Sequence, residues 1–239
     1  MYRREAKTIG LLGGMSWEST QTYYRMLNQG VAEKLGGFHS AKIVLYSVDF
    51  AEIETLQRQG DWEAMADILA NAACSLAAAG ADFLVIGTNT MHKVAAEVEA
   101  ASGLPLLHIA EATADILAQQ GIDRVGLLGT QFTMEQPFYR QRLEARGIEV
   151  IAPEPEQREV IHRVIYQELC RGTINPASKE AYLDVVATLS ARGAQGVILG
   201  CTEIGLLINQ SDTPVALFDT TEIHAQRAVA WALGDGVAS

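Results

Sequence analysis

Three short segments of this chain recur later in the same order and at nearly constant separation. The paired segments are Thr8–Gly14 with Arg124–Thr130, Asp82–Thr90 with Gln195–Glu203, and Leu104–His108 with Thr213–Leu217. Their offsets are 116, 113 and 109 residues, so the register drifts little along the chain. A period as long as a domain predicts two copies of one unit built from strands and helices, and not a solenoid.

Short apolar runs alternate with longer helical patterns. The expected strands are Thr8–Leu12, Lys42–Val48, Asp82–Ile86, Pro105–His108, Arg124–Leu128, Glu149–Ala152, Gly196–Leu199 and Pro214–Phe218. Several are apolar at successive positions, as is typical of parallel strands covered on both faces. The expected helices include Asp61–Ala79, Glu156–Arg171 and Ser178–Arg192, each followed by glycine, and a last helix at about Thr220–Leu233.

This alternation predicts an α/β fold with two pseudo-symmetric lobes, each a parallel sheet flanked by helices. The first lobe is expected at 1–106 plus about 219–239, and the second at 107–218. We expect the active site in the cleft between the lobes, because ligands of parallel sheets collect at the carboxyl ends of strands.

Composition excludes several classes of protein. Apolar residues make up 49% of the chain and charged residues 20%, which is incompatible with a disordered chain. A net charge of −11 argues against nucleic acid as a partner. No apolar run is long enough to span a membrane, and the N-terminal residues do not resemble a signal peptide. Three cysteines without a paired framework fit a reducing cytoplasm, and five scattered histidines predict no metal site.

Four glycine-led loops follow predicted strands and precede predicted helices. They are Gly13–Ser19, Gly87–His92, Gly129–Thr133 and Gly200–Glu203. Helix N-termini expose N–H groups and partial positive charge, so such loops favour carboxylate or phosphate ligands. Helix capping is the structural alternative for the hydroxyl residues Ser16, Thr88, Thr90, Thr133 and Thr202. The glycines at 10, 13 and 14 lack the spacing of a dinucleotide-binding loop.

Cys201 is the strongest candidate for chemistry, because it lies at a predicted helix start, where a thiolate is favoured. Cys74 and Cys170 lie within helical patterns and are expected to be structural. His92 is expected either to orient polar groups of the site or to face the core. Asn89 is expected to hold a substrate amine or carboxylate, or to serve as a turn residue.

These motifs together resemble the pyridoxal-independent aspartate/glutamate racemase superfamily. The matching segments are Ile9–Thr20, Thr88–Lys93, Leu127–Thr130, Gly200–Gly205 and Phe218–Ala225, spread over the whole chain. The resemblance implies two similar lobes with a substrate cleft, a homodimer, and an isomerase that inverts Cα of a small amino acid without a cofactor. In that superfamily two opposed cysteines remove the α-proton and return it on the other face.

The chain departs from the superfamily pattern at one of these two positions. Cys201 matches the second-lobe cysteine, whereas Thr88 stands where the first-lobe cysteine is expected. This pair resembles a subgroup of L-aspartate/glutamate-specific or broad-specificity racemases. The resemblance therefore implies Thr88 and Cys201 as catalytic residues. It implies the following substrate-binding residues: Met15, Ser16, Gln57, Asn89, Thr90, Thr130, Thr133, Glu168 and Thr202.

Other activities remain open at the level of sequence. Maleate isomerase, arylmalonate decarboxylase and hydantoin racemase relatives share the lobes and one cysteine, and a non-catalytic amino-acid-binding module would need no second base. A threonine hydroxyl is a far weaker base than a thiol, so slow turnover is expected. Backbone N–H groups near Asn89, Thr90 and Thr202 are expected to stabilise the enolate. Gln57, Arg58 and Arg163 are candidates for binding a second substrate carboxylate.

Overall fold

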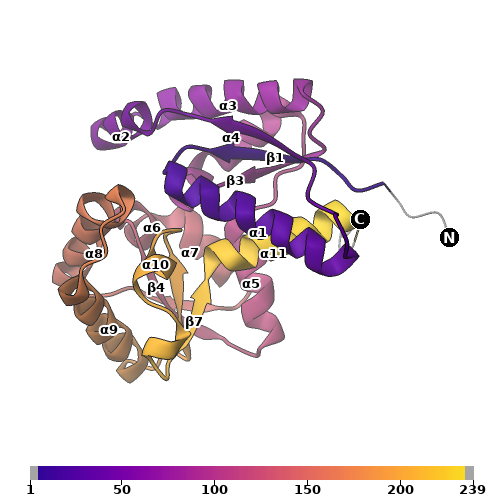
Figure 1. Cartoon of the computed structure of the whole chain (residues 1–239). Coiled ribbons are helices and arrows are strands. Elements are labelled where there is room, and N and C mark those ends of the chain that lie inside the picture. Colours follow the sequence, from indigo (N-terminus) through magenta and orange to yellow (C-terminus); the bar gives the residue numbers. More distant parts are fainter. Residues whose placement is uncertain (1–4, 235–239) are drawn as a thin grey trace. The chain divides into compact units, whose positions relative to one another are not determined.

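The computed structural model describes residues 5–234, so 1–4 and 235–239 of the predicted first lobe lie outside the described residues (Figure 1). Two separate parallel sheets form within this range, one of three strands and one of four. Helices flank both sheets, which confirms the predicted α/β class. None of the described helices is long and apolar enough to cross a membrane.

The chain divides into two compact units, one made of residues up to 108 and from 224 onward, the other of residues 109–223. The elements of the first unit, in chain order, are β1 (Ile9–Gly13), α1 (Trp17–Leu35), β2 (Ile43–Ser47), α2 (Phe50–Gln59), α3 (Trp62–Ala78), β3 (Phe83–Ile86), a 3₁₀ helix (Thr90–Val94) and α4 (Ala95–Ser102). The last helix, α11 (Thr220–Leu233), begins in the second unit and continues into the first.

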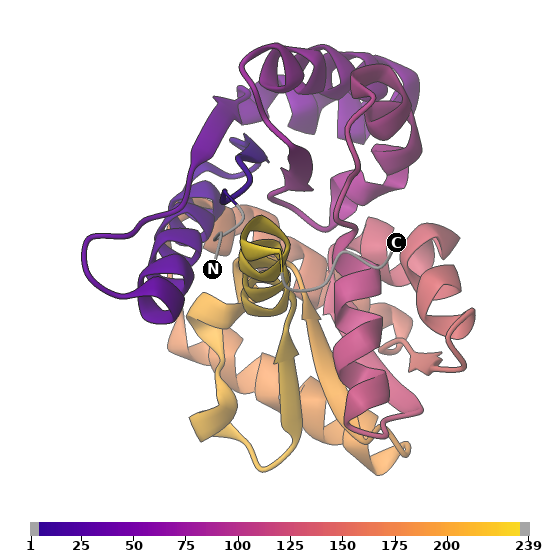
Figure 2. The ribbon, with the colours of Figure 1, turned by 90° about the vertical axis from the view of Figure 1, so that its right-hand side faces the viewer.

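The sheet of the first unit has the strand order β2-β1-β3. Ile9 and Leu11 face one side, where they pack with α1 and with the later turns of α11. Leu12 faces the opposite side, where α3 and α4 provide the core. Figures 1 and 2 both show α11 (yellow) beside α1 (indigo). Both faces of the central strand are therefore covered, as its continuous apolar sequence predicts.

The second unit repeats this arrangement with one more strand. Its elements are α5 (Ile109–Gln119), β4 (Arg124–Gly129), α6 (Gln131–Glu135), α7 (Pro137–Glu144), β5 (Glu149–Ile151), α8 (Pro155–Gln167), a 3₁₀ helix (Leu169–Arg171), α9 (Pro176–Ala191), β6 (Gly196–Gly200), α10 (Ile204–Leu207), a 3₁₀ helix (Gln210–Asp212) and β7 (Ala216–Asp219). The strand order is β5-β4-β6-β7. Its first strand again lies between the second and third, as in the first unit. The helices α8 and α9 pack on one face, and α5 and α7 pack on the other.

One predicted strand, Pro105–His108, is wrong. Only an isolated parallel bridge forms there, between Leu106 and Leu84 of β3. The Leu84 N–H donates to the Pro105 carbonyl, and the Leu107 N–H donates to the Leu84 carbonyl. Helix α5 begins at Ile109, directly after this bridge. The segment is extended but too short to continue the ladder.

Candidate functional site

The strand ends of the second unit bring two of the predicted site segments together. Gly129 of β4 and Gly200 of β6 are register partners, so Thr130 and Cys201 both leave the sheet at its carboxyl edge. A Cβ at Gly200 would lie 2.6 Å from the Leu128 carbonyl oxygen. Only glycine permits this approach of the two strands, which sets the starting point of the Cys201 loop.

Cys201 is nearly buried, with 7% of its surface exposed. Its Sγ donates a hydrogen bond to Oε2 of Glu203 at 3.0 Å, and Oγ1 of Thr202 donates to the same oxygen at 2.8 Å. Burial, followed by the charge of Glu203, raises the pKa of the Cys201 thiol well above its usual range. The expectation of a thiolate stabilised by a helix start is therefore wrong. The following helix, α10, has only four residues, and the burial of the thiol together with the carboxylate outweighs it.

Glu203 is the residue of this site that sequence reasoning missed. It is 3% exposed, and its side chain accepts hydrogen bonds from Cys201 and Thr202. In the sequence it is a carboxylate two positions beyond a reactive cysteine, in a loop that we expected to hold substrate. An acidic residue at a helix start is also the common pattern for balancing the helix dipole, so the sequence alone gives no preference for a role in proton transfer.

Thr130 and Thr133 lie beside this group, whereas Glu168 is engaged elsewhere. Thr130 caps α6, and its Oγ1 lies 3.3 Å from Oγ1 of Thr133. Thr133 also lies close to Gly200, because a Cβ atom added to Gly200 would be 3.5 Å from Cγ2 of Thr133. Glu168 stands at the end of α8 and accepts a hydrogen bond from Ser178 of α9 at 2.7 Å.

The first unit gathers a matching group of residues at the ends of β1 and β3. Leu12 and Ile86 are register partners, and Oγ of Ser19 donates to the Gly87 carbonyl oxygen at 3.1 Å, which joins the two loops. Met15 is buried, and Ser16 caps α1 by accepting from the Ser19 N–H. Capping is thus the observed role of the Ser16 hydroxyl.

The loop after β3 holds Thr88, Asn89 and Thr90. Thr88 is partly exposed, whereas Asn89 and Thr90 are buried. Asn89 occupies the cap position of the 3₁₀ helix without a side-chain capping bond. Thr88, Thr90, Thr133 and Thr202 stand at no cap position of the described helices, so capping is wrong for these four. Nδ1 of His92 lies 2.7 Å from the Thr88 carbonyl oxygen.

The candidates for binding a second carboxylate are placed very differently from one another. Gln57 is 4% exposed on α2, and its Nε2 donates to Sδ of Met91 at 3.4 Å, within the first unit. Arg58 is exposed and paired with Glu54 of the same helix. Arg163 is exposed on α8. Gln57 is therefore the only one of these three that the fold buries, and its partner Met91 directly follows Thr90 of the predicted site in the sequence.

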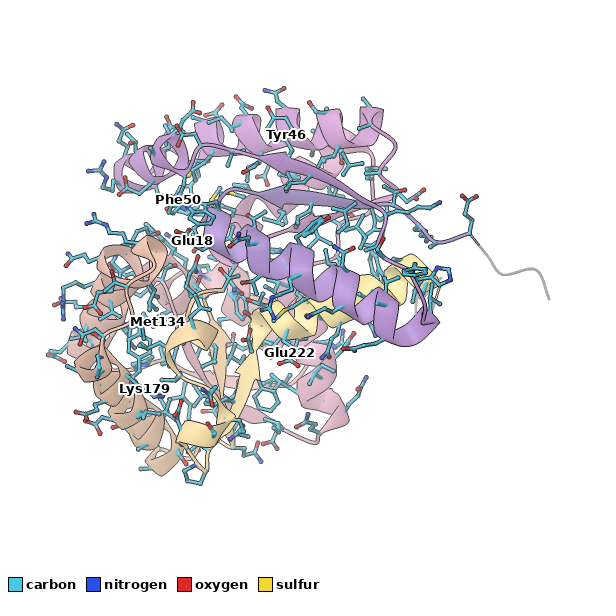
Figure 3. The ribbon with its side chains drawn as sticks, in the orientation of Figure 1. Glu18, Tyr46, Phe50, Met134, Lys179 and Glu222 are labelled. Carbon is cyan, nitrogen blue, oxygen red and sulfur yellow. The ribbon has the colours of Figure 1, made fainter. Side chains whose placement is uncertain are left out.

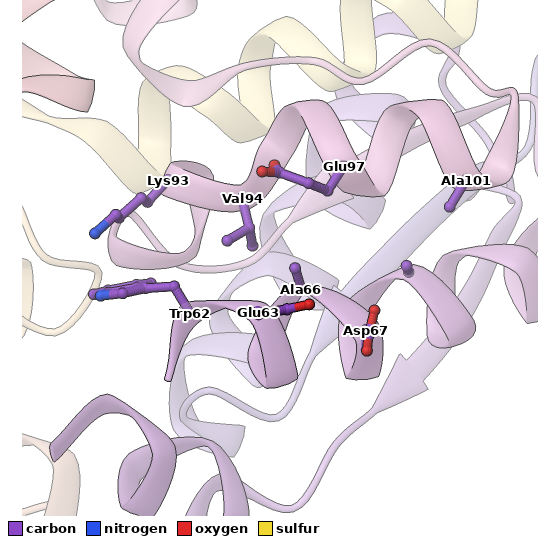
Figure 4. Close-up of a pocket in the computed structure, with 9 residues that line it drawn as sticks. Trp62, Glu63, Ala66, Asp67, Lys93, Val94, Glu97 and Ala101 are labelled. Carbon is purple, nitrogen blue, oxygen red and sulfur yellow. The ribbon is translucent and has the colours of Figure 1, made fainter. Parts of the chain in front are cut away.

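A hollow of about 440 Å³ lies between α3 and the segment that leads into α4 (Figure 4). Trp62, Glu63 and Asp67 line it from α3, and Lys93 and Glu97 line it from the opposite side. Nζ of Lys93 lies 3.8 Å from the centroid of the Trp62 ring. None of the predicted site residues lines this hollow, so it is distinct from both strand-end groups. Within residues 5–234, no group of three or more His, Cys, Asp or Glu is placed to hold a metal ion.

Comparison with known proteins is informative over nearly the whole chain. Residues 12–228 match the family described as Asp/Glu/Hydantoin racemase. Among curated proteins, the broad specificity amino-acid racemase RacX of Bacillus subtilis (strain 168) is 23% identical over 234 residues, which cover 92% of this chain and 96% of that protein.

Solved structures give closer matches. A putative Asp/Glu racemase from Yersinia pestis is 61% identical, with a TM-score of 0.88, and the match covers 95% of this chain and 99% of that one. An aspartate racemase homologue from Pyrococcus horikoshii OT3 is 36% identical, with a TM-score of 0.82 and the same coverage of both chains.

Proposed function

The chain belongs to the Asp/Glu/hydantoin racemase family, and from this premise we propose that it inverts Cα of aspartate, glutamate or a related amino acid. The reaction removes the α-proton and returns one on the opposite face without a cofactor. The observation that carries this proposal is the thiol of Cys201, held at a strand end with a buried carboxylate as its hydrogen-bond acceptor. The names of the relatives support an amino acid as the substrate.

Cys201 acts on one face of the substrate, with Glu203 as the group that holds its proton. The S–H proton moves along the existing hydrogen bond to Oε2 of Glu203, and the resulting thiolate takes the α-proton. In the reverse direction the Cys201 thiol delivers its proton to the carbanion, and Glu203 returns a proton to sulfur. Charge and protons balance in both directions.

Thr88 acts on the opposite face. An alcohol is a poor base at neutral pH, so this side limits turnover. The two enantiomers have equal free energy in water, so kcat/KM must be the same in both directions. A difference between directions therefore appears in kcat and in KM separately.

Substrate is held by the residues around these two groups. On the Thr88 side we assign Met15, Ser16, Gln57, Asn89 and Thr90, and on the Cys201 side Thr130, Thr133 and Thr202. Their buried hydroxyl and amide groups suit a zwitterion with a polar side chain, because they offer both donors and acceptors. Backbone N–H groups near Asn89 and Thr202 stabilise the enolate that forms on the carboxylate. Glu168 is a weaker candidate for contact with substrate, given its bond to Ser178.

We also propose that the protein is a cytoplasmic homodimer. None of the three cysteines forms a disulfide, which suits a reducing compartment. Strand β2 lies at the edge of its sheet, and Leu45 and Tyr46 expose 45% and 42% of their surfaces there. Tyr46 is labelled in Figure 3. Strands of parallel sheets are usually covered on both faces, and an exposed edge strand can pair with another chain. We therefore assign a second copy of this chain as the partner that covers this edge.

Proton NMR in D₂O with the purified protein tests the function directly. The panel contains both enantiomers of aspartate, glutamate and homoserine, together with hydantoins, arylmalonates and maleate. We expect loss of the α-proton signal and inversion for an amino acid, with Cys201→Ser abolishing both. Thr88→Cys is expected to speed racemisation, because a thiol with a pKa of about 8.5 is a better base than an alcohol.

Other results of the same experiment contradict the proposal. Full exchange in Cys201→Ser would remove Cys201 from the mechanism, and normal racemisation in Thr88→Ala would remove Thr88. Turnover of only a hydantoin, an arylmalonate or maleate would assign the chain to a different reaction of the superfamily. Thermal stabilisation by an amino acid without any exchange would identify a binding module.

A further inference from the structure

Three histidines from distant parts of the sequence meet in the interior of the first unit, directly behind Thr88. They are His92 after β3, His108 before α5 and His224 on α11, and each is at most 6% exposed. The ring of His92 lies 4.6 Å from that of His108 and 5.6 Å from that of His224, measured between centroids. This histidine cluster is not used by the mechanism described above.

The hydrogen bonds of the cluster fix where two of the rings carry their protons. A carbonyl oxygen can only accept, so Nδ1 of His92 donates to the Thr88 carbonyl. By the same reasoning Nε2 of His224 donates to the Leu107 carbonyl at 2.8 Å. Burial lowers the pKa of His224 to about 4, so its ring is neutral and Nδ1 must accept from the Tyr23 hydroxyl at 2.8 Å.

The His92 bond sets the direction of the peptide group between Thr88 and Asn89. In a planar trans peptide the C=O and N–H point in opposite directions. With the Thr88 carbonyl held toward His92, the Asn89 N–H points away from the cluster. The Cα of Thr88 lies in the same plane, so the bond also restricts the point from which the Thr88 side chain extends.

We infer that His92 is a positioning residue for Thr88, with the Nδ1–H to carbonyl bond as its means and the packed rings of His108 and His224 as its support. The inference rests on the proposed racemase function. The Nδ1 bond of His92 is made to the main-chain carbonyl of Thr88, so this bond leaves the Thr88 hydroxyl to the substrate.

A variant that misplaces only Thr88 can be distinguished from one with general damage to the fold by comparing α-proton exchange with racemisation. Cys201 alone can remove the α-proton from one enantiomer and return deuterium to the same face, which gives exchange without inversion. Inversion also needs Thr88. Misplacing Thr88 therefore lowers racemisation but spares exchange on the Cys201 side, whereas general damage lowers both in proportion.

The test uses a matched pair, His92→Asn and His92→Leu. Both side chains branch at the same atom and both remove the ring, but only Asn keeps an N–H donor near the Nδ1 position. We expect His92→Leu to lower racemisation roughly tenfold to a hundredfold, the scale of a misplaced catalytic group. Its α-proton exchange on the Cys201 side should stay close to that of the unmodified protein. His92→Asn should recover most of the racemisation.

Tyr23→Phe serves as the control, since it removes a hydrogen bond from the same cluster without touching Thr88. Its ratio of exchange to racemisation should match that of the unmodified protein. His92→Phe, which keeps a ring in the cavity, replaces His92→Leu if the latter does not fold. An unchanged ratio in the donor-free variant, or an equal loss in the Asn and Leu variants, overturns the inference. Absence of both exchange and racemisation in the unmodified protein overturns the proposed function instead.

Discussion

The thiol of Cys201 and the hydroxyl of Thr202 donate to a single oxygen of one buried carboxylate. Burial, and after it the charge of Glu203, raises the pKa of the Cys201 thiol, so at neutral pH sulfur holds its proton. In the proposed mechanism the resting thiol is an acid, and it becomes a base only when Glu203 takes its proton. Glu203 would then both disfavour the free thiolate at rest and allow it to form during the reaction.

Glu203→Gln separates these two effects because it removes the charge but keeps an oxygen that can accept. We expect the pKa of Cys201 to fall, so that iodoacetamide alkylates it faster at a given pH. We expect α-proton removal by Cys201 to slow, because an amide cannot store the thiol proton. Both measurements are made with Cys74→Ser and Cys170→Ser in place, so that only Cys201 reports. Faster exchange together with faster alkylation would show that Glu203 merely restrains the thiol.

At the scale of elements, the glycine-led loops set where the site residues begin. Gly14 has φ +92°, and a Cβ there would lie 2.2 Å from the Val48 carbonyl oxygen. Its N–H donates to Oγ1 of Thr20 at 2.8 Å. The loop that carries Met15 and Ser16 is therefore tied to both α1 and the end of β2.

Gly14→Ala is expected to lower the free energy of unfolding more than Gly80→Ala does. Gly80 has nearly the same φ, +91°, but a Cβ added there would meet open space. Its substitution therefore measures only the free-energy cost of placing alanine in this backbone conformation, about 1 kcal/mol. Gly14→Ala adds a clash with main-chain atoms that cannot move cheaply. Urea unfolding of both variants measures the difference. Equal losses would mean that the β1 loop yields without strain.

The helices and strands were largely predictable, because apolar runs indicate the strands and the glycines that follow the helices indicate where the helices end. The runs at Thr8–Leu12 and Gly196–Leu199 became β1 and β6 within a residue of the expected bounds. Asp61–Ala79 became α3 with Asp61 as its cap. The expected strand at Pro105–His108 was wrong, because the length of a ladder depends on where the next helix starts and not on the run itself.

The candidate site was predictable only where one short segment carries it. Cys201 and Thr88 stand within motifs that can be recognised locally. Glu203 required knowledge of side-chain direction, since the same residue at a helix start is usually exposed. The meeting of His92 with His224 joins residues far apart in the sequence and leaves no periodic or spacing signal. Contacts of this kind come from packing, which a single sequence does not display.

At the scale of the whole molecule, the two units share the order of their first three strands. Gly87 directly follows β3 and Gly200 ends β6, the third strands of their units, so Thr88 and Cys201 hold equivalent places in the repeat. The departure from a cysteine pair is thus a single difference, Thr88 in place of cysteine, between two units of the same architecture. The exposed apolar residues of β2 have no counterpart on β5, where Val150 and Ile151 are buried and only Glu149 is exposed.

Tyr46→Lys is expected to convert the proposed dimer into monomers, because a charge on the edge strand opposes pairing with a second copy. Sedimentation velocity over a range of concentrations measures the change. Ile174→Lys is the matched control, since Ile174 is an exposed apolar residue of the second unit and exposes a similar fraction, 49%. A dimer that survives Tyr46→Lys, or that dissociates with Ile174→Lys, would place the interface elsewhere.

The first unit is interrupted in the chain, because residues 109–223 stand between its two parts. The ribosome therefore synthesises the whole second unit before it adds the later turns of α11. Until then the face of the first sheet that α11 covers stays incomplete, and His224 is missing from the group behind Thr88. Domains usually fold as they emerge, in order from the N-terminus. Here the loop with Thr88, the earlier of the two proposed catalytic residues, gains its support last, after the segment with Cys201 has already been made.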